Sequence, residues 1–279
     1  MKNGSFARHH RGVDDLYPMK LQAPLKDYIW GGTKLKTDYG KKTDLEKVSE
    51  SWELACHKDG MSIIENGPEA GRTLKSYLDE AGPAVLGEHA KKFPYFPLLI
   101  KLIDAKDNLS VQVHPDNDYA MRVEGEYGKT EMWYIVDCEP GATLIYGFKH
   151  AISKEEFEKR IADNTLLEVC NQVPVHKGDV FFIASGTLHA IGKGIIICEI
   201  QQNSNTTYRV YDYGRLGKDG KPRELHVKKA IDVTNLEPVK ERPHLDAPID
   251  IFADTEARLL ASCEYFMVYE LEIDGTSYL

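Results

Sequence analysis

The chain has 279 residues, a length that suits one large β-rich domain or one domain with a smaller piece. Hydrophobic residues make up 42% of it, enough for a packed core, and because the longest apolar runs have only strand length we expect no membrane-spanning segment. The net charge of −9 argues against nucleic-acid and membrane-surface partners, and the five scattered cysteines, with no C-x-x-C pair, favour a reducing cytoplasm over a disulfide framework.

The first half of the chain begins with a polar stretch. Residues 1–15 are predicted to form a mobile tail, so the His9-His10 pair is interpreted as part of the tail and not as a metal site. Residues 21–70 alternate short strand-like runs with Gly- and Pro-bearing turns. Residues 73–92 have a helical pattern that breaks at Gly82-Pro83.

Strand patterns dominate the rest of the chain. The runs FPLLIKLI, LSVQV, EMWYIV and TLIYG follow one another. Residues 153–169 are helical again, with Ser153 as N-cap and acidic residues in the first turn. The runs QVPVHKGDVFFIASG, IIICEIQQ and TYRVYDY then resume the strands. Several short strands separated by Gly- and Pro-bearing turns predict an antiparallel sandwich or barrel.

The strand LSVQVHPD has an unusual polar face. Leu109, Val111 and Val113 alternate with polar residues, and successive side chains of a strand point to opposite faces. One face therefore carries Ser110, Gln112 and His114. Such a face either meets water, as in any half-buried strand, or lines a site, and partners from elsewhere in the chain must decide between the two.

Two other stretches carry residues of the types that bind metals. In the strand of residues 129–136, Lys129, Glu131 and Trp133 share a face. Between residues 178 and 194, His189 follows a Gly-containing turn. Imidazole and carboxylate are metal-ligating groups, so these residues are candidates for a metal site.

The stretch GDVFFIASGTLHAIGKG resembles the second cupin motif, with Ala184 in a position usually held by proline. With FPLLIKLIDAKDNLSVQVHPD, GKTEMWYI, QQNSNTTYRVYDYGR, IWGGTKL and RELHVKKA, it is similar to the short bacterial branch of the type I mannose-6-phosphate isomerases, from about Leu16 to the last residue. The resemblance implies a mainly β fold, a cupin-type antiparallel β-barrel (jelly roll) with helical inserts near 73–92 and 153–169. The catalytic domain is expected over residues 16–245.

The resemblance also implies a metal centre. It places one zinc ion per chain on Gln112, His114, Glu131 and His189. A catalytic zinc site leaves one position open for water or substrate. Gln112 is the weakest member of this set, because an amide oxygen is a poor zinc ligand.

The implied reaction interconverts mannose 6-phosphate and fructose 6-phosphate through an enediol. The family's active-site arginine falls on Arg209, Lys129 shares the strand face of Glu131, and Glu199 falls on a carboxylate of the pocket. Ser110, Lys101 and Trp30 are expected to contact the hexose 6-phosphate substrate. The proton-abstracting base is left open between Glu199, Lys129 and zinc-bound water.

Other interpretations compete with these. Arg209 could instead lie at the surface and pair with Asp212. Lys101 could extend to solvent at the rim of a barrel, and Trp30 could be a core residue. At the level of function, the alternatives are a non-catalytic sugar-binding or regulatory cupin, and a metal-dependent cupin oxygenase. The complete set of ligands and cations disfavours the first. The QxH pattern, where oxygenases usually have HxH, disfavours the second.

The last part of the sequence has strand character. Residues 246–279 are similar to the start of the family's C-terminal β-domain, which is expected to be shortened here. Strands within residues 263–274 then have few partners, and an unpaired apolar edge invites association. We expect the edge to be covered either by the barrel or by a second chain, as in a homodimer.

Overall fold

The computed structural model describes residues 16–217, 219–240 and 256–273. The expected N-terminal tail, with its two histidines, and residues 246–255 and 274–279 of the expected C-terminal domain lie outside these ranges. All strand pairings between named strands of the described residues are antiparallel. None of the described helices is long and apolar enough to span a membrane.

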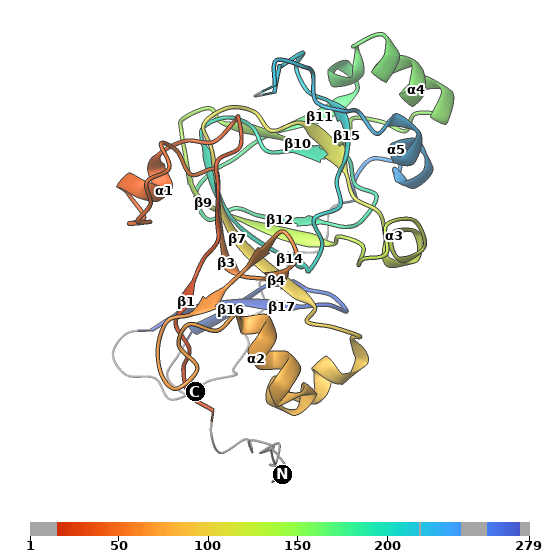
Figure 1. Ribbon diagram of the computed structural model, residues 1–279. Helices are drawn as coiled ribbons and strands as arrows, with labels where there is room; N and C mark the ends of the chain where they lie inside the picture. The colour runs from red at the N-terminus through yellow and green to blue at the C-terminus, as the bar shows by residue number, and fades with distance from the viewer. Residues whose placement is uncertain (1–15, 218, 241–255, 274–279) are drawn as a thin grey trace.

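Two sheets face each other and enclose the interior of the molecule (Figure 1). The six-stranded sheet has the order β12 (Val180–Ile183), β9 (Glu131–Cys138), β14 (Ile195–Gln202), β7 (Leu98–Ala105), β3 (Glu50–Leu54), β2 (Leu25–Lys26). The five-stranded sheet has the order β11 (Cys170–Pro174), β10 (Thr143–Phe148), β13 (His189–Ala190), β8 (Val111–Val113), β15 (Tyr208–Tyr211). Three further pairs are β1 (Leu21–Gln22) with β6 (Ile63–Ile64), β4 (Cys56–His57) with β5 (Gly60–Met61), and β16 (Glu256–Ser262) with β17 (Met267–Glu272).

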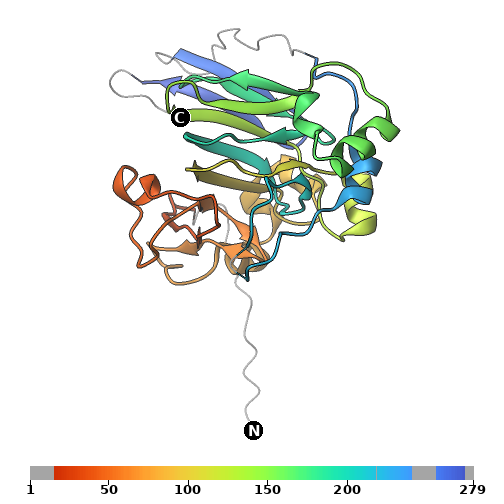
Figure 2. The same ribbon diagram turned by 90° about the horizontal axis from the view of Figure 1, so that it is seen from above.

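Helices occupy the outside of the two sheets (Figure 2). They are α1 (Lys34–Thr37), α2 (Leu74–Ala81), α3 (Asn117–Val123), α4 (Lys154–Ala162) and α5 (Val227–Val233), with short 3₁₀ turns at Pro83–Leu86, Glu88–Lys92 and Leu166–Glu168. Both helical inserts lie where the sequence predicts them. Gly82 ends α2 because its φ of +79° lies in the region that favours glycine, and the Ser153 hydroxyl accepts a hydrogen bond from the Glu156 amide as the N-cap of α4.

Apolar side chains fill both faces of the five-stranded sheet. Val111 and Val113 point outward, into a cluster with Phe157 of α4 and Ala230 of α5. The interior cluster lies between the two sheets and includes Trp133, Ile197 and Trp30. Leu109 was expected to share the outward face but packs in the interior cluster, because it precedes the start of β8 at Val111.

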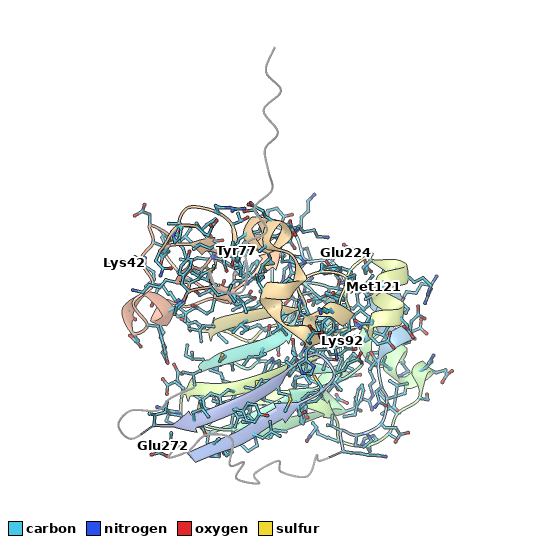
Figure 3. All side chains as sticks on the ribbon, turned by 90° about the horizontal axis from the view of Figure 1, so that it is seen from below. Lys42, Tyr77, Lys92, Met121, Glu224 and Glu272 are labelled. Carbon is cyan, nitrogen blue, oxygen red and sulfur yellow. The ribbon has the colours of Figure 1, made fainter. Side chains whose placement is uncertain are left out.

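The hairpin β16–β17 lies across the outer face of the six-stranded sheet (Figure 3). Phe266 and Ala261 pack there against Met132 of β9. At the turn of the hairpin, Lys92 donates a hydrogen bond to the Glu264 carbonyl at 2.9 Å. The described strands of the C-terminal segment therefore pack against the six-stranded sheet of their own chain. The homodimer stays a prediction.

Candidate active site and metal centre

Three buried residues from three strands form a possible metal cluster. His114 follows β8, Glu131 begins β9 and His189 begins β13. Their ligand atoms all lie within 4.8 Å of one another, and each side chain is at most 1% exposed. Antiparallel pairing sets this proximity, because His189 lies opposite Gln112, two residues before His114.

Hydrogen bonds fix how both imidazoles present their nitrogens. The Nδ1 atom of His114 lies 2.9 Å from the Thr206 carbonyl, and that of His189 lies 2.8 Å from the Thr187 carbonyl. Since a carbonyl only accepts, each Nδ1 carries the proton and each Nε2 keeps its lone pair. The two Nε2 atoms nevertheless face each other at 3.1 Å. Two acceptors at this distance need a cation between or beside them. The Lys129 ammonium lies 3.2 Å from His114 Nε2, whereas a metal ion between the rings would bind both nitrogens.

Glu131 adds an unsatisfied carboxylate. Both of its oxygens are buried without a hydrogen-bond partner, although the Lys129 ammonium lies 2.8 Å from Oε2. Burial and the nearby Glu199 raise the pKa of Glu131, and burial together with Lys129 lowers the pKa of His114 well below its usual range. A divalent cation would favour the ionised form of this carboxyl group. Together with the two neutral imidazoles, the carboxylate therefore makes a suitable set of ligands for such a cation.

Gln112 lies between this cluster and a cavity. It faces His189 of β13 on one side and Arg209 of β15 on the other. Its Oε1 accepts a hydrogen bond from the Ser110 hydroxyl at 3.3 Å. The expected role of Gln112 as a fourth ligand stays a prediction.

The cavity has a volume of about 290 Å³ and opens beside the metal cluster. All the residues that the sequence analysis assigns to catalysis (Lys129, Glu199, Arg209) and to substrate binding (Trp30, Lys101, Ser110) line this cavity. Its lining consists of Tyr28, Trp30, Glu50, Lys101, Ile103, Leu109, Ser110, Gln112, Lys129, Ile191, Glu199, Asn205, Thr207, Arg209 and Arg223.

Two buried lysines hold Glu199 at the cavity wall. Lys101 Nζ lies 3.3 Å and Lys129 Nζ 3.7 Å from Glu199 Oε1, while Trp133 Nε1 donates to Oε2 at 2.9 Å. Burial disfavours the charged carboxylate, but the two ammonium groups outweigh it and lower the pKa of Glu199. Lys129 Nζ also lies 3.2 Å from His114 Nε2, so it connects Glu199 with the metal cluster.

Arg209 lies at the cavity and not in a pair with Asp212. Its Nε donates to the Ser110 hydroxyl at 3.2 Å and its Nη1 to the Glu224 carbonyl at 3.0 Å. The carboxylate of Asp212 instead accepts hydrogen bonds from Arg215 and Arg223. Lys101 is not at a solvated rim, because it is 3% exposed. Trp30 lines the cavity and also packs in the interior cluster.

The sequence pattern misses several cavity residues. Arg223 lies in a loop without periodicity, and its guanidinium binds Asp212 in a bidentate way, with distances of 2.7 and 2.6 Å. Glu50, on β3, lies 3.6 Å from Lys101 Nζ. Strict alternation along a strand would place Tyr211 on the same face as Arg209. A register shift between these two residues instead turns Tyr211 to the outer cluster.

Comparison of this sequence with known proteins identifies a family of metabolic enzymes. The family model "Phosphomannose isomerase type I, catalytic domain" matches residues 19–137. A probable mannose-6-phosphate isomerase of Bacillus subtilis is 42% identical over 264 residues, which cover 93% of this chain and 81% of the relative. The chain belongs to the type I mannose-6-phosphate isomerase family. A relative named mannose-6-phosphate isomerase from Streptococcus mutans is 42% identical over 265 residues, 93% of this chain and 80% of the relative.

Solved structures support the same family. The crystal structure of the mannose 6-phosphate isomerase from Bacillus subtilis superposes with a TM-score of 0.81 at 40% identity, covering 92% of this chain and 81% of the other. The expected fold, a mainly β cupin with helical inserts, is thereby confirmed. Membership of this isomerase family also decides against the oxygenase and the non-catalytic cupin.

Proposed function

We propose that this chain interconverts D-mannose 6-phosphate and D-fructose 6-phosphate through an enediol, with one zinc ion held by His114, Glu131, His189 and Gln112. The observation that carries the metal site is the pair of Nε2 lone pairs 3.1 Å apart beside the buried carboxylate of Glu131, with all ligand atoms within 4.8 Å of one another. The names of the relatives supply the substrate class. Zinc suits these ligands because it accepts imidazole nitrogen and carboxylate oxygen.

The cavity fits an anionic sugar. Its volume of about 290 Å³ lies near the lower end of the range for small-molecule sites. Four cations line it, namely Lys101, Lys129, Arg209 and Arg223. Three of these cations have carboxylate partners, because Lys101 lies near Glu50 and Glu199, Lys129 near Glu131, and Arg223 binds Asp212. Arg209 binds neutral groups among the described residues, so its charge is available for a phosphate group. Charge-assisted hydrogen bonds to the phosphate hold the substrate in place, so that remote binding energy orients the reacting carbons.

The reaction moves a proton between C1 and C2 of the sugar. When bound, zinc supplies Lewis-acid polarisation of the carbonyl oxygen. We assign the proton transfer to the Glu199–Lys129 pair, because both side chains line the cavity and their charged groups lie 3.7 Å apart. Ser110 and Arg209 share a hydrogen bond at the cavity wall and orient the sugar, and Trp30 forms an apolar part of that wall.

The domain organisation follows from the same proposal. Residues 16–245 form the catalytic domain, and residues 246–279 belong to the family's second β-domain. All five cysteines are free thiols, which accords with a cytoplasmic location.

A coupled assay for fructose 6-phosphate tests the activity. Mannose 6-phosphate should be converted, a chelator should abolish the conversion, and zinc should restore it. Unphosphorylated mannose should be a far poorer substrate, because each charge-assisted bond to the phosphate contributes roughly 1.5–3 kcal/mol. Equal turnover of mannose and its 6-phosphate would rule out the phosphate pocket.

Exchange of the C2 hydrogen of mannose 6-phosphate with D₂O, followed by NMR, tests the proton transfer. Glu199→Gln and Lys129→Met should each stop the exchange while zinc remains bound. Exchange at the wild-type rate in both variants would contradict the assignment.

A further inference from the structure

A partly buried carboxylate outside the proposed active site holds the segment that orients a proposed metal ligand. Glu126 lies after α3, with its side chain 13% exposed. Its Oε1 accepts hydrogen bonds from the Ser204 hydroxyl at 3.4 Å, from the Asn205 amide at 3.3 Å and from the Thr206 hydroxyl. Glu126 Oε1 thus binds three consecutive residues of the segment that connects β14 with β15.

The other oxygen of Glu126 faces His57 of β4. The Asp59 amide donates to His57 Nδ1 at 3.1 Å, so the proton of the neutral ring is on Nε2. That Nε2 lies 3.2 Å from Glu126 Oε2 and donates to it. His57 is 5% exposed, and Lys58 adds an ammonium 3.6 Å from the same oxygen. Contacts with β4 and the residues after it therefore fix the position of the Glu126 carboxylate, independently of its contacts with residues 204–206.

The segment leads directly to the metal cluster. Thr206, whose hydroxyl donates to Glu126, presents its backbone carbonyl to His114 Nδ1 at 2.9 Å. This carbonyl sets both the tautomer and the ring orientation of His114, and with them the direction of the Nε2 lone pair. The neighbouring Asn205 and Thr207 line the substrate cavity. Displacement of residues 204–206 would therefore change both the metal site and the cavity wall.

We propose that Glu126 is a positioning residue for the metal centre, which clamps residues 204–206 so that the Thr206 carbonyl aligns His114 for zinc. This inference rests on the proposed function, since it requires that zinc binds at His114. A carboxylate suits the task because one oxygen can accept several hydrogen bonds while the other accepts a hydrogen bond from His57 Nε2. Loss of such outer groups weakens metal affinity by roughly 10- to 100-fold.

The test measures the zinc dissociation constant by competition with a chromophoric chelator, together with thermal unfolding of the metal-free protein. Glu126→Ala removes the clamp. Glu124→Ala is the matched control, because Glu124 lies two residues earlier and its Oε1 binds Tyr208 at 2.8 Å and Lys229 at 2.6 Å, without contact to residues 204–206. Thr206→Val serves as a milder second variant, because it removes the hydroxyl but keeps the carbonyl.

We expect Glu126→Ala to weaken zinc binding by about 10-fold or more, Thr206→Val by less in the same direction, and Glu124→Ala by less than about threefold. Both alanine variants should lower the unfolding temperature of the metal-free protein. Wild-type zinc affinity in folded Glu126→Ala or Thr206→Val, or an equal loss in Glu124→Ala, would overturn the inference and leave the proposed function intact. A wild-type protein that binds no zinc would overturn both.

Discussion

Replacement of Arg209 by lysine tests whether the planar guanidinium, and not only its charge, is needed at the cavity. Arg209 uses two of its N–H groups on Ser110 and Glu224, so three N–H groups have no acceptor among the described residues. One of them belongs to Nη1 and two belong to Nη2, and donors on these two neighbouring nitrogens form a fork suited to two oxygens of the substrate. Lysine keeps the charge but loses at least one charge-assisted bond, worth roughly 1.5–3 kcal/mol. Because about 1.4 kcal/mol is a tenfold rate change, kcat/KM should fall about 10- to 150-fold.

The assay couples fructose 6-phosphate formation to a chromogenic readout and compares Arg209→Lys with Arg209→Ala. The alanine variant should lie within about tenfold of the lysine variant, since both lose the fork, and zinc content should stay normal in both. Arg215→Lys is the matched control, because Arg215 binds Asp212 and the Asn108 carbonyl and does not line the cavity. Near wild-type kcat/KM for Arg209→Lys would show that the arginine contributes charge only.

Three further predictions concern metal binding, pH and stability. His189→Ala should lose most of its zinc by elemental analysis, and full occupancy would place the site elsewhere. Because burial lowers the pKa of His189 to about 4, below its usual 6.5, the unfolded chain binds more protons between these pH values, so the metal-free protein should lose stability to urea as the pH falls from about 6.5 to 4. The lowered pKa of His114 adds to this loss and the raised pKa of Glu131 opposes it, so His189→Asn should make the loss less steep than in the wild type. An unchanged slope would exclude His189 as a source. Phe266→Ala should lower the free energy of unfolding by about 3 kcal/mol, because Phe266 is 7% exposed against the sheet, whereas Met267→Ala, at a residue 58% exposed, should change it by less than about 0.5 kcal/mol. Equal effects of the two would mean that the hairpin does not pack on the barrel in solution.

Local patterns in the sequence were sufficient to predict the type and position of many helices and strands. The break at Gly82 and the N-cap at Ser153 depend on the chemistry of a few neighbouring residues, and both lie where they were predicted. The alternation of Ser110, Gln112 and His114 with Val111 and Val113 likewise follows from strand geometry, and in the structure the valines point outward while Ser110 and Gln112 line the cavity. The remaining proposed site residues were predicted from the resemblance to the family.

Tertiary structure decided what depends on register and on contacts between distant segments. The shift in β15 that turns Tyr211 outward comes from pairing with β8, which leaves no trace in the alternation of the sequence. Arg223 reaches the cavity because the buried Asp212 holds its guanidinium, and Glu126 reaches the Thr206 segment across 80 residues of chain. Local propensity determines the shape of an element, whereas the partner of a charged side chain is set by which segments the two facing sheets bring together.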